Sequence, residues 1–222
     1  IRVCEINISS LAKYYKITKE AKYWQAILAV REKFVNGQGQ QSLGNINFGD
    51  TLNSLYKATN DERYRNILLQ LANSEISKFD DQTNTPFYSI TVIRTVFIPA
   101  YGISGDSKYL FSAENFFDRF NAVENLDSFH TFNAVELADT LLSLSNFSEK
   151  GETYKAQAHA VLQKLLILWD SPQNLQFNGD YGFIDALGRQ QVNKSVLING
   201  WLTNLFLSLK DESFKNPQSY AK

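Results

Sequence analysis

A nine-residue unit that begins and ends on an aromatic residue recurs along the chain and constrains what it can fold into. It reads YKITKEAKY at 15–23, YKATNDERY at 56–64 and YGISGDSKY at 101–109, and FLSLKDESF at 206–214 keeps the outer aromatics and the central acid. The segment LSNFSEKGETY at 144–154 has two extra residues in its turn and fills the gap before the last copy. A period of about 40 to 45 residues indicates stacked helical hairpins.

Each copy predicts a helix, a tight turn and a second helix. Around the second copy, apolar residues recur at helical spacing on both sides of the turn: Phe48, Leu52, Leu55, then Tyr64, Leu68 and Leu71. We expect Asp61 to cap the second helix, because a carboxylate there meets free backbone N–H groups and the positive end of the helix dipole. The aromatics on both sides are expected to pack the hairpin.

The acid and a base keep their places in the other copies. Glu20, Asp106 and Asp211 correspond to Asp61, and a base follows the acid by two residues at Lys22, Arg63 and Lys108. We expect the acids to serve as helix caps and the bases to be solvated.

The pattern predicts an all-α chain of about five hairpins in a single domain over 1–222. The expected helices are 6–16 and 20–35, 47–58 and 61–78, 87–101 and 106–120, 131–145 and 150–169, and 193–209 and 212–220. Such hairpins either stack as an open solenoid or close into a ring whose long connections crowd one rim above a pocket. Alternating segments around NGD at 178–180 predict a short β-hairpin near 173–190.

Composition excludes several functional classes. The net charge is −1 with no basic stripe, so neither nucleic acid nor an anionic membrane is an expected partner. No apolar run approaches the roughly 18 residues needed for a membrane span. The single Cys4 excludes a disulfide framework, and we expect no metal or other cofactor, since the chain lacks metal-ligand spacings and a phosphate-binding loop. The chain opens on Ile1, so we expect a processed or artificial N-terminus, with a lean towards a secreted or extracytoplasmic location.

The turn forms YKATNDERY and YGISGDSKY resemble the helix–turn–helix corners of the (α/α) toroid enzymes of carbohydrate metabolism. The stretch 168–209 is similar to their pattern of an outer helix, a short β-excursion and a returning inner helix. This superfamily includes six-hairpin glycosidases, endo-α-mannanases and N-acylglucosamine 2-epimerases. The resemblance implies a toroid around a sugar site, and the ten helices expected here against twelve in a full ring imply an incomplete one.

Three carboxylates are candidates for the long-connection rim. Asp80 and Asp81 lie in a connection between hairpins, and Asp50 begins an expected inner helix behind a Gly-rich loop. A glycosidase uses one carboxylic acid to protonate the leaving oxygen and a second carboxylate as base or nucleophile. We expect Asp81 and Asp50 to be catalytic and Asp80 to bind substrate. The alternative is that the first two form a turn and that Asp50 stabilises a helix N-terminus.

The segment DSFHTFNAVE at 127–136 is the most polar-aromatic helix start in the chain. His130, Asn133 and Glu136 recur at helical spacing, so His130 and Glu136 are candidate catalytic groups and Asn133 a candidate substrate ligand. The alternative is a cluster of hydrogen bonds that starts a helix. The adjacent Asp pair of the mannanase-like families does not transfer directly, since Asp80 and Asp81 follow no Trp-rich run. The paired His residues of the epimerases do not transfer directly either.

Two further groups complete the candidate site. Asp180 and Tyr181 lie in the expected β-excursion, where such enzymes overhang the substrate, although turn chemistry explains them equally well. Trp201 and Tyr88 are candidates for stacking on sugar rings, and core packing is their alternative role.

These residues favour a carbohydrate-active enzyme, a glycoside hydrolase acting on an oligo- or polysaccharide. A sugar epimerase or isomerase of the same fold is the nearest alternative. A non-catalytic helical-repeat module that binds carbohydrate or protein is the second. The sequence gives no basis for an oligomeric state.

Overall fold

The computed structural model describes residues 11–12, 14–15, 17–35, 49–78, 86–120, 131–166, 169–170, 182–183, 201–202 and 205. This part of the chain is mostly helical. The chain divides into two compact units, Ile1–Phe120 and Asn121–Lys222, and each is treated by itself below. The single domain expected from the sequence stays a prediction.

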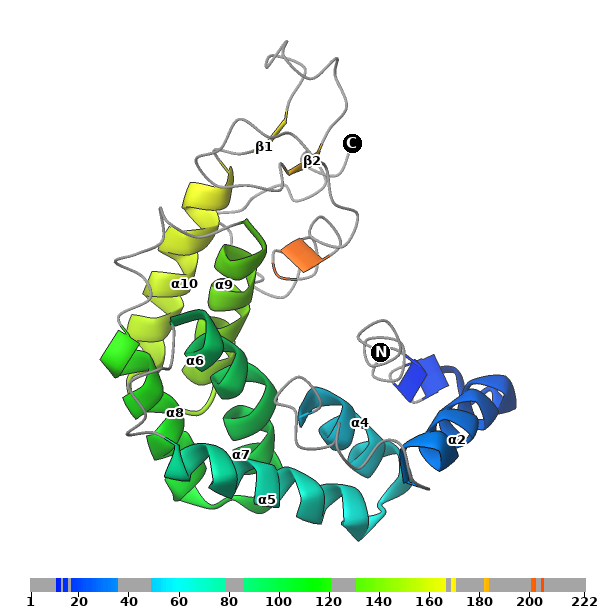
Figure 1. Ribbon diagram of the computed structural model, residues 1–222. Coiled ribbons are helices and arrows are strands. Elements are labelled where there is room, and N and C mark those ends of the chain that lie inside the picture. The colour runs from blue at the N-terminus through cyan, green and yellow to red at the C-terminus, as the bar shows by residue number, and fades with distance from the viewer. Residues whose placement is uncertain are drawn as a thin grey trace. The chain divides into compact units, whose positions relative to one another are not determined.

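The first unit consists of helical hairpins. Its described elements are α2 (Ala21–Val35), α4 (Gly49–Thr59), α5 (Glu62–Ser77), α6 (Pro86–Val92), η2 (Ile93–Phe97), α7 (Ile98–Ser104) and α8 (Ser107–Phe120). Helix α4 packs on α5, and α8 packs on the continuous run from α6 through η2 to α7 (Figure 1). Their bounds agree with the expected helices to within about three residues.

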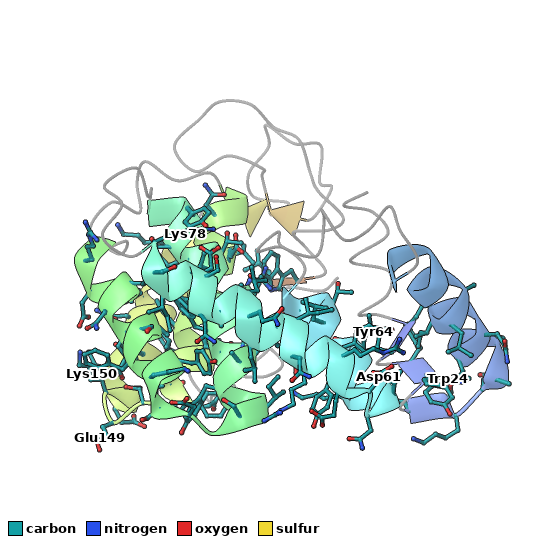
Figure 2. All side chains as sticks on the ribbon, turned by 60° about the horizontal axis from the view of Figure 1, so that its bottom comes forward. Trp24, Asp61, Tyr64, Lys78, Glu149 and Lys150 are labelled. Atoms are coloured by element: carbon teal, nitrogen blue, oxygen red, sulfur yellow. The ribbon has the colours of Figure 1, made fainter. Side chains whose placement is uncertain are left out.

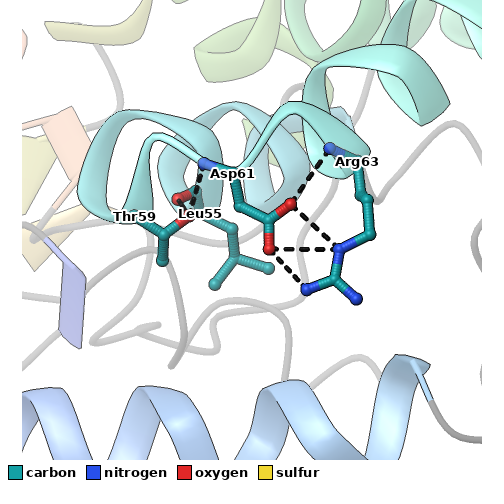
Figure 3. Close-up of polar contacts among 4 residues, drawn as sticks. All are labelled: Leu55, Thr59, Asp61 and Arg63. Atoms are coloured by element: carbon teal, nitrogen blue, oxygen red, sulfur yellow. Dashed lines mark hydrogen bonds and ion pairs between the residues drawn. The ribbon is translucent and has the colours of Figure 1, made fainter.

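The corner between α4 and α5 is built from hydrogen bonds that span four residues or fewer (Figure 3). The hydroxyl of Thr59 donates to the carbonyl of Leu55 at 2.7 Å and accepts from the backbone N–H of Asp61 at 3.2 Å. Asn60 takes a left-handed conformation with φ of 54°. Asp61 then accepts the N–H of Arg63 at 3.1 Å, which confirms it as the N-cap of α5.

Two other copies of the unit form the same corner. Thr18 and Ser104 repeat the hydroxyl-to-carbonyl bond of Thr59, and Lys19 (φ 58°) and Gly105 (φ 70°) take the left-handed position. The backbone N–H groups of Glu20 and Asp106 bond the two hydroxyl groups at 3.2 Å. The recurring sequence is therefore a recurring backbone geometry. Asp211, its counterpart in the last copy, lies outside the described residues.

The bases of the unit are exposed, as expected, and each also pairs with the acid two residues before it. The distances from nitrogen to carboxylate oxygen are 2.6 Å for Lys22–Glu20, 2.6 Å for Arg63–Asp61 and 3.3 Å for Lys108–Asp106. The closing aromatics confirm the packing role, since Tyr64 and Tyr109 are buried.

The run from Pro86 to Ser104 differs from the single α-helix expected over 87–101, because its middle turn, η2, is π-helical. Pro99 stands at the start of α7 and has no N–H for the carbonyl of Thr95, four residues earlier. In an α-helix its ring would also crowd that carbonyl, and the wider π turn removes the conflict. Phe97 and Phe116 pack edge to face in the core beside this turn, with ring centroids 5.0 Å apart.

The second unit contains the hairpin of α9 (Thr131–Ser145) and α10 (Gly151–Leu166). Its longer turn uses Ser148 where the other corners use an acid: the Ser148 hydroxyl accepts the N–H of Lys150 at 3.0 Å. Strands β1 (Trp169–Asp170) and β2 (Gly182–Phe183) pair antiparallel, with Trp169 opposite Phe183. Most of the β-hairpin expected near 173–190 lies outside the described residues.

The expected helix 6–16 is represented by helical residues 11–12 and 14–15, and the expected helix 193–209 by residues 201–202 and 205. The expected helix 212–220 lies outside the described part. Within the described ranges, none of the helices has the length and apolarity that crossing a bilayer requires.

Candidate functional site

Half of the ten candidate residues belong to the described part of the chain. They are Asp50 and Tyr88 in the first unit and Asn133, Glu136 and Trp201 in the second. The other five lie outside it: Asp80, Asp81, His130, Asp180 and Tyr181. Their proposed roles stay predictions.

Asp50 occupies the first turn of α4, where a carboxylate also interacts favourably with the helix dipole. Its Oδ2 lies 2.8 Å from Nη1 of Arg94, on the π-helical turn η2. The Asp50 side chain is 39% exposed and that of Arg94 21% exposed. The site therefore contains an accessible carboxylate whose orientation is fixed from a neighbouring helical run.

Tyr88, near the start of α6, makes a half-buried polar contact, and its expected stacking on a sugar stays a prediction. Its hydroxyl lies 2.5 Å from Oε2 of Glu75, and Nζ of Lys78 lies 2.7 Å from Oε1 of the same carboxylate. The Glu75 side chain is fully buried, so its charge is balanced by Lys78 and solvated by the phenol. Tyr88 thus joins α6 to the end of α5.

Sequence reasoning missed Glu75, although a signal was present. Leu68, Leu71 and Ala72 form the apolar stripe of α5, and Glu75 falls on that stripe one turn later. An acid at such a position must find a partner inside the protein, because burying an unpaired carboxylate is costly.

Asp50 and Glu75 lie at the same end of the α4–α5 hairpin. Helix α4 begins beside Asp50 and α5 ends just after Glu75, and the short corner at Asp61 joins their other ends. Figure 2 shows Lys78 and Asp61 at opposite ends of α5. The polar contacts of Asp50, Arg94, Glu75 and Tyr88 therefore belong to the end from which the longer connections leave.

In the second unit the candidates are on α9 and beside it. Glu136 is 2% exposed, and Asn133, one turn before it, is half-buried. The indole N–H of Trp201 donates to Oδ2 of Asp139 at 3.2 Å. The spacing of Asn133 and Glu136 thus places both on adjacent turns, as predicted, while the Trp201–Asp139 contact was not foreseen.

A metal centre finds no support in the described ranges, because they contain no cluster of three or more His, Cys, Asp or Glu side chains able to hold an ion. Comparison with protein-family models, curated proteins and solved structures finds no match for this chain.

Proposed function

We propose that this chain is a carbohydrate-active enzyme, a glycoside hydrolase built on an incomplete (α/α) toroid of helical hairpins. The observation that carries the proposal is Asp50, an accessible carboxylate fixed by Arg94 at the long-connection end of the α4–α5 hairpin. The corner geometry shared by three hairpins supports a repeat architecture, because the same turn joins the two helices of each hairpin.

Hydrolysis of a glycosidic bond needs a proton for the leaving oxygen and a carboxylate on the opposite face of the sugar. In the proposed site Asp81, three residues after Lys78 in the sequence, supplies the proton. Asp50 supplies the negative charge, as base towards water or as nucleophile. Glu75 is fully buried, so it has no access to substrate and acts by holding Tyr88 and Lys78.

The second unit carries its own group of candidate residues, which is treated by itself. In this unit His130 and Glu136 remain candidate catalytic groups, and Asn133, Trp201, Asp180 and Tyr181 are candidate sugar contacts. The candidate sugar contacts of the first unit are Asp80 and Tyr88. Glu136 is only 2% exposed, so a catalytic role would require the substrate to reach it from the face of α9 that it shares with Asn133. A sugar epimerase or isomerase would use the same residues on a different bond.

One observation favours a non-catalytic carbohydrate- or protein-binding module as the second candidate. Both Asp50 and Glu75 are bonded to side chains of the protein itself, Asp50 to Arg94 and Glu75 to Lys78 and Tyr88. Carboxylates that stabilise the helix ends in this way are sufficient for a scaffold that binds without turnover.

The test is a glycan array followed by measurement of reducing ends released from each bound oligosaccharide. The wild-type chain is compared with Asp50→Asn and Asp81→Asn, and with Asp61→Asn as a matched control at the opposite end of the hairpin. We expect each rim variant to reduce release at least about 100-fold, within the range of acid–base catalysis, while the control keeps it. Binding without release would establish the module, and release that survives both rim substitutions would remove the catalytic assignment.

A further inference from the structure

The first turn of α4 lies directly against the π-helical turn η2. A Cβ added to Gly49 would lie 1.7 Å from the carbonyl oxygen of Thr95, so only the bare backbone of a glycine fits. Gly49 precedes Asp50, and Thr95 follows Arg94. The backbone contact and the ion pair are therefore adjacent parts of one junction.

Pro99 explains why the carbonyl of Thr95 does not make the α-helical hydrogen bond to residue 99. Proline cannot donate the hydrogen bond that this carbonyl would accept in an α-helix, and the π turn moves the carbonyl clear of the proline ring. The neighbours of Arg94 on this turn, Ile93, Thr95 and Val96, are buried, which leaves the turn little freedom to rotate.

The π turn also sets the direction of Arg94. A π-helical turn contains one residue more than an α-helical turn, so it changes the facing of every side chain before it by about 100° relative to an uninterrupted α-helix. Without this insertion the start of the run would face another way relative to α7. Arg94 and Phe97 both lie within this turn, so its π-helical geometry sets the direction of Arg94 towards α4 relative to the packing of Phe97 on Phe116.

We propose that the π-helical turn is a positioning device: Pro99 imposes it, Gly49 seats α4 on it, and Arg94 holds the carboxylate of Asp50 from it. Arg94 is thus a positioning residue for Asp50. The structural half of this inference is that Arg94 holds Asp50 from the π turn, and it rests on the junction alone. The catalytic half is that this contact orients Asp50 for the reaction, and it rests on the proposed function.

The structural half is tested by a double-mutant cycle on the full chain. Arg94→Gln, Asp50→Asn and the double variant are compared by thermal unfolding, with Arg65→Gln as a control, because Arg65 makes an exposed ion pair with Glu62 at 3.3 Å. We expect each single variant to lower the Tm and the double variant to lower it no further than the larger single effect. The control should stay near the wild-type Tm. Additive effects in the double variant would overturn the device.

The catalytic half is tested on the oligosaccharide that the wild-type chain cleaves. Arg94→Gln should lower kcat at least about tenfold with KM nearly unchanged, because it disturbs the orientation of Asp50 and not sugar binding. Arg94→Lys keeps the charge without the planar guanidinium and should recover part of kcat. Equal losses in kcat for both variants, or a change confined to KM, would refute positioning. If the wild-type chain cleaves no oligosaccharide, the catalytic half fails together with the proposed function. The double-mutant cycle measured by thermal unfolding would still test the structural half.

Discussion

Asp61 caps α5 and pairs with Arg63 through the same carboxylate. Oδ1 accepts the backbone N–H of Arg63 at 3.1 Å, while Oδ2 lies 2.6 Å from Nη2 of its guanidinium (Figure 3). The two interactions differ in their contribution to the free energy of unfolding, because a cap satisfies a backbone donor and an exposed ion pair contributes little. Substitutions at Asp61 can separate them.

Asp61→Ala should lower the free energy of unfolding by about 1 kcal/mol, since the N–H of Arg63 loses its acceptor. Asp61→Asn keeps an acceptor oxygen and loses the exposed ion pair and the charge at the helix N-terminus, so its loss should be the smaller of the two. Urea unfolding followed by circular dichroism measures both. Equal losses for the two variants would show that the charge dominates this corner.

The left-handed position of the corner predicts opposite effects at two of its copies. Lys19 has φ of 58°, which strains a residue with a Cβ, so Lys19→Gly should raise the free energy of unfolding by about 0.5 kcal/mol. Gly105 has φ of 70°, and Gly105→Ala should lower it by about 1 kcal/mol. Chemical denaturation gives both values, and effects of the same sign at the two sites would contradict the shared geometry.

Asp106 predicts a dependence of stability on pH. The backbone N–H of Lys108 and then its ammonium group hold the pKa of the Asp106 carboxyl below its ordinary value of 3.8. A pKa that is lower in the folded state contributes stability above the ordinary value, and that stability is lost as the pH falls through the lowered one. The Tm advantage of wild type over Asp106→Asn should therefore shrink as the pH falls from 5 to about 2. An advantage that grows in acid would reverse the assignment.

Substituting alanine at two glycines of the first unit should change the free energy of unfolding in opposite directions. Gly49→Ala should lower the free energy of unfolding by about 3 kcal/mol or more, because the new methyl group meets the backbone of Thr95 at 1.7 Å. Gly102, in α7, has open space around it, so Gly102→Ala should raise the same quantity by about 0.5 to 1 kcal/mol. Thermal and urea unfolding of the pair test this, and a neutral Gly49→Ala would mean that α4 does not pack on η2.

The helices and corners could be predicted from the sequence because they depend on neighbours. The cap at Asp61, the turn at Asn60 and the packing of Tyr64 all follow from residues within one turn of helix. The π turn before Pro99 was not predicted, although a proline inside a helical pattern disturbs an α-helix.

The contacts at the candidate site could not be predicted in the same way. Arg94 and Asp50 are 44 positions apart, and Trp201 and Asp139 are 62 apart. Such pairs depend on how helices pack, which periodicity does not specify. The contact of Tyr88 with Glu75 was also not predicted, because Glu75 was not recognised as buried.

The corner geometry has a consequence for how such a chain changes over time. The hydroxyl and cap hydrogen bonds of the corner join residues at most four positions apart, so they depend on one short stretch of sequence. A sequence change confined to one corner would therefore leave the hydrogen bonds of the other corners in place.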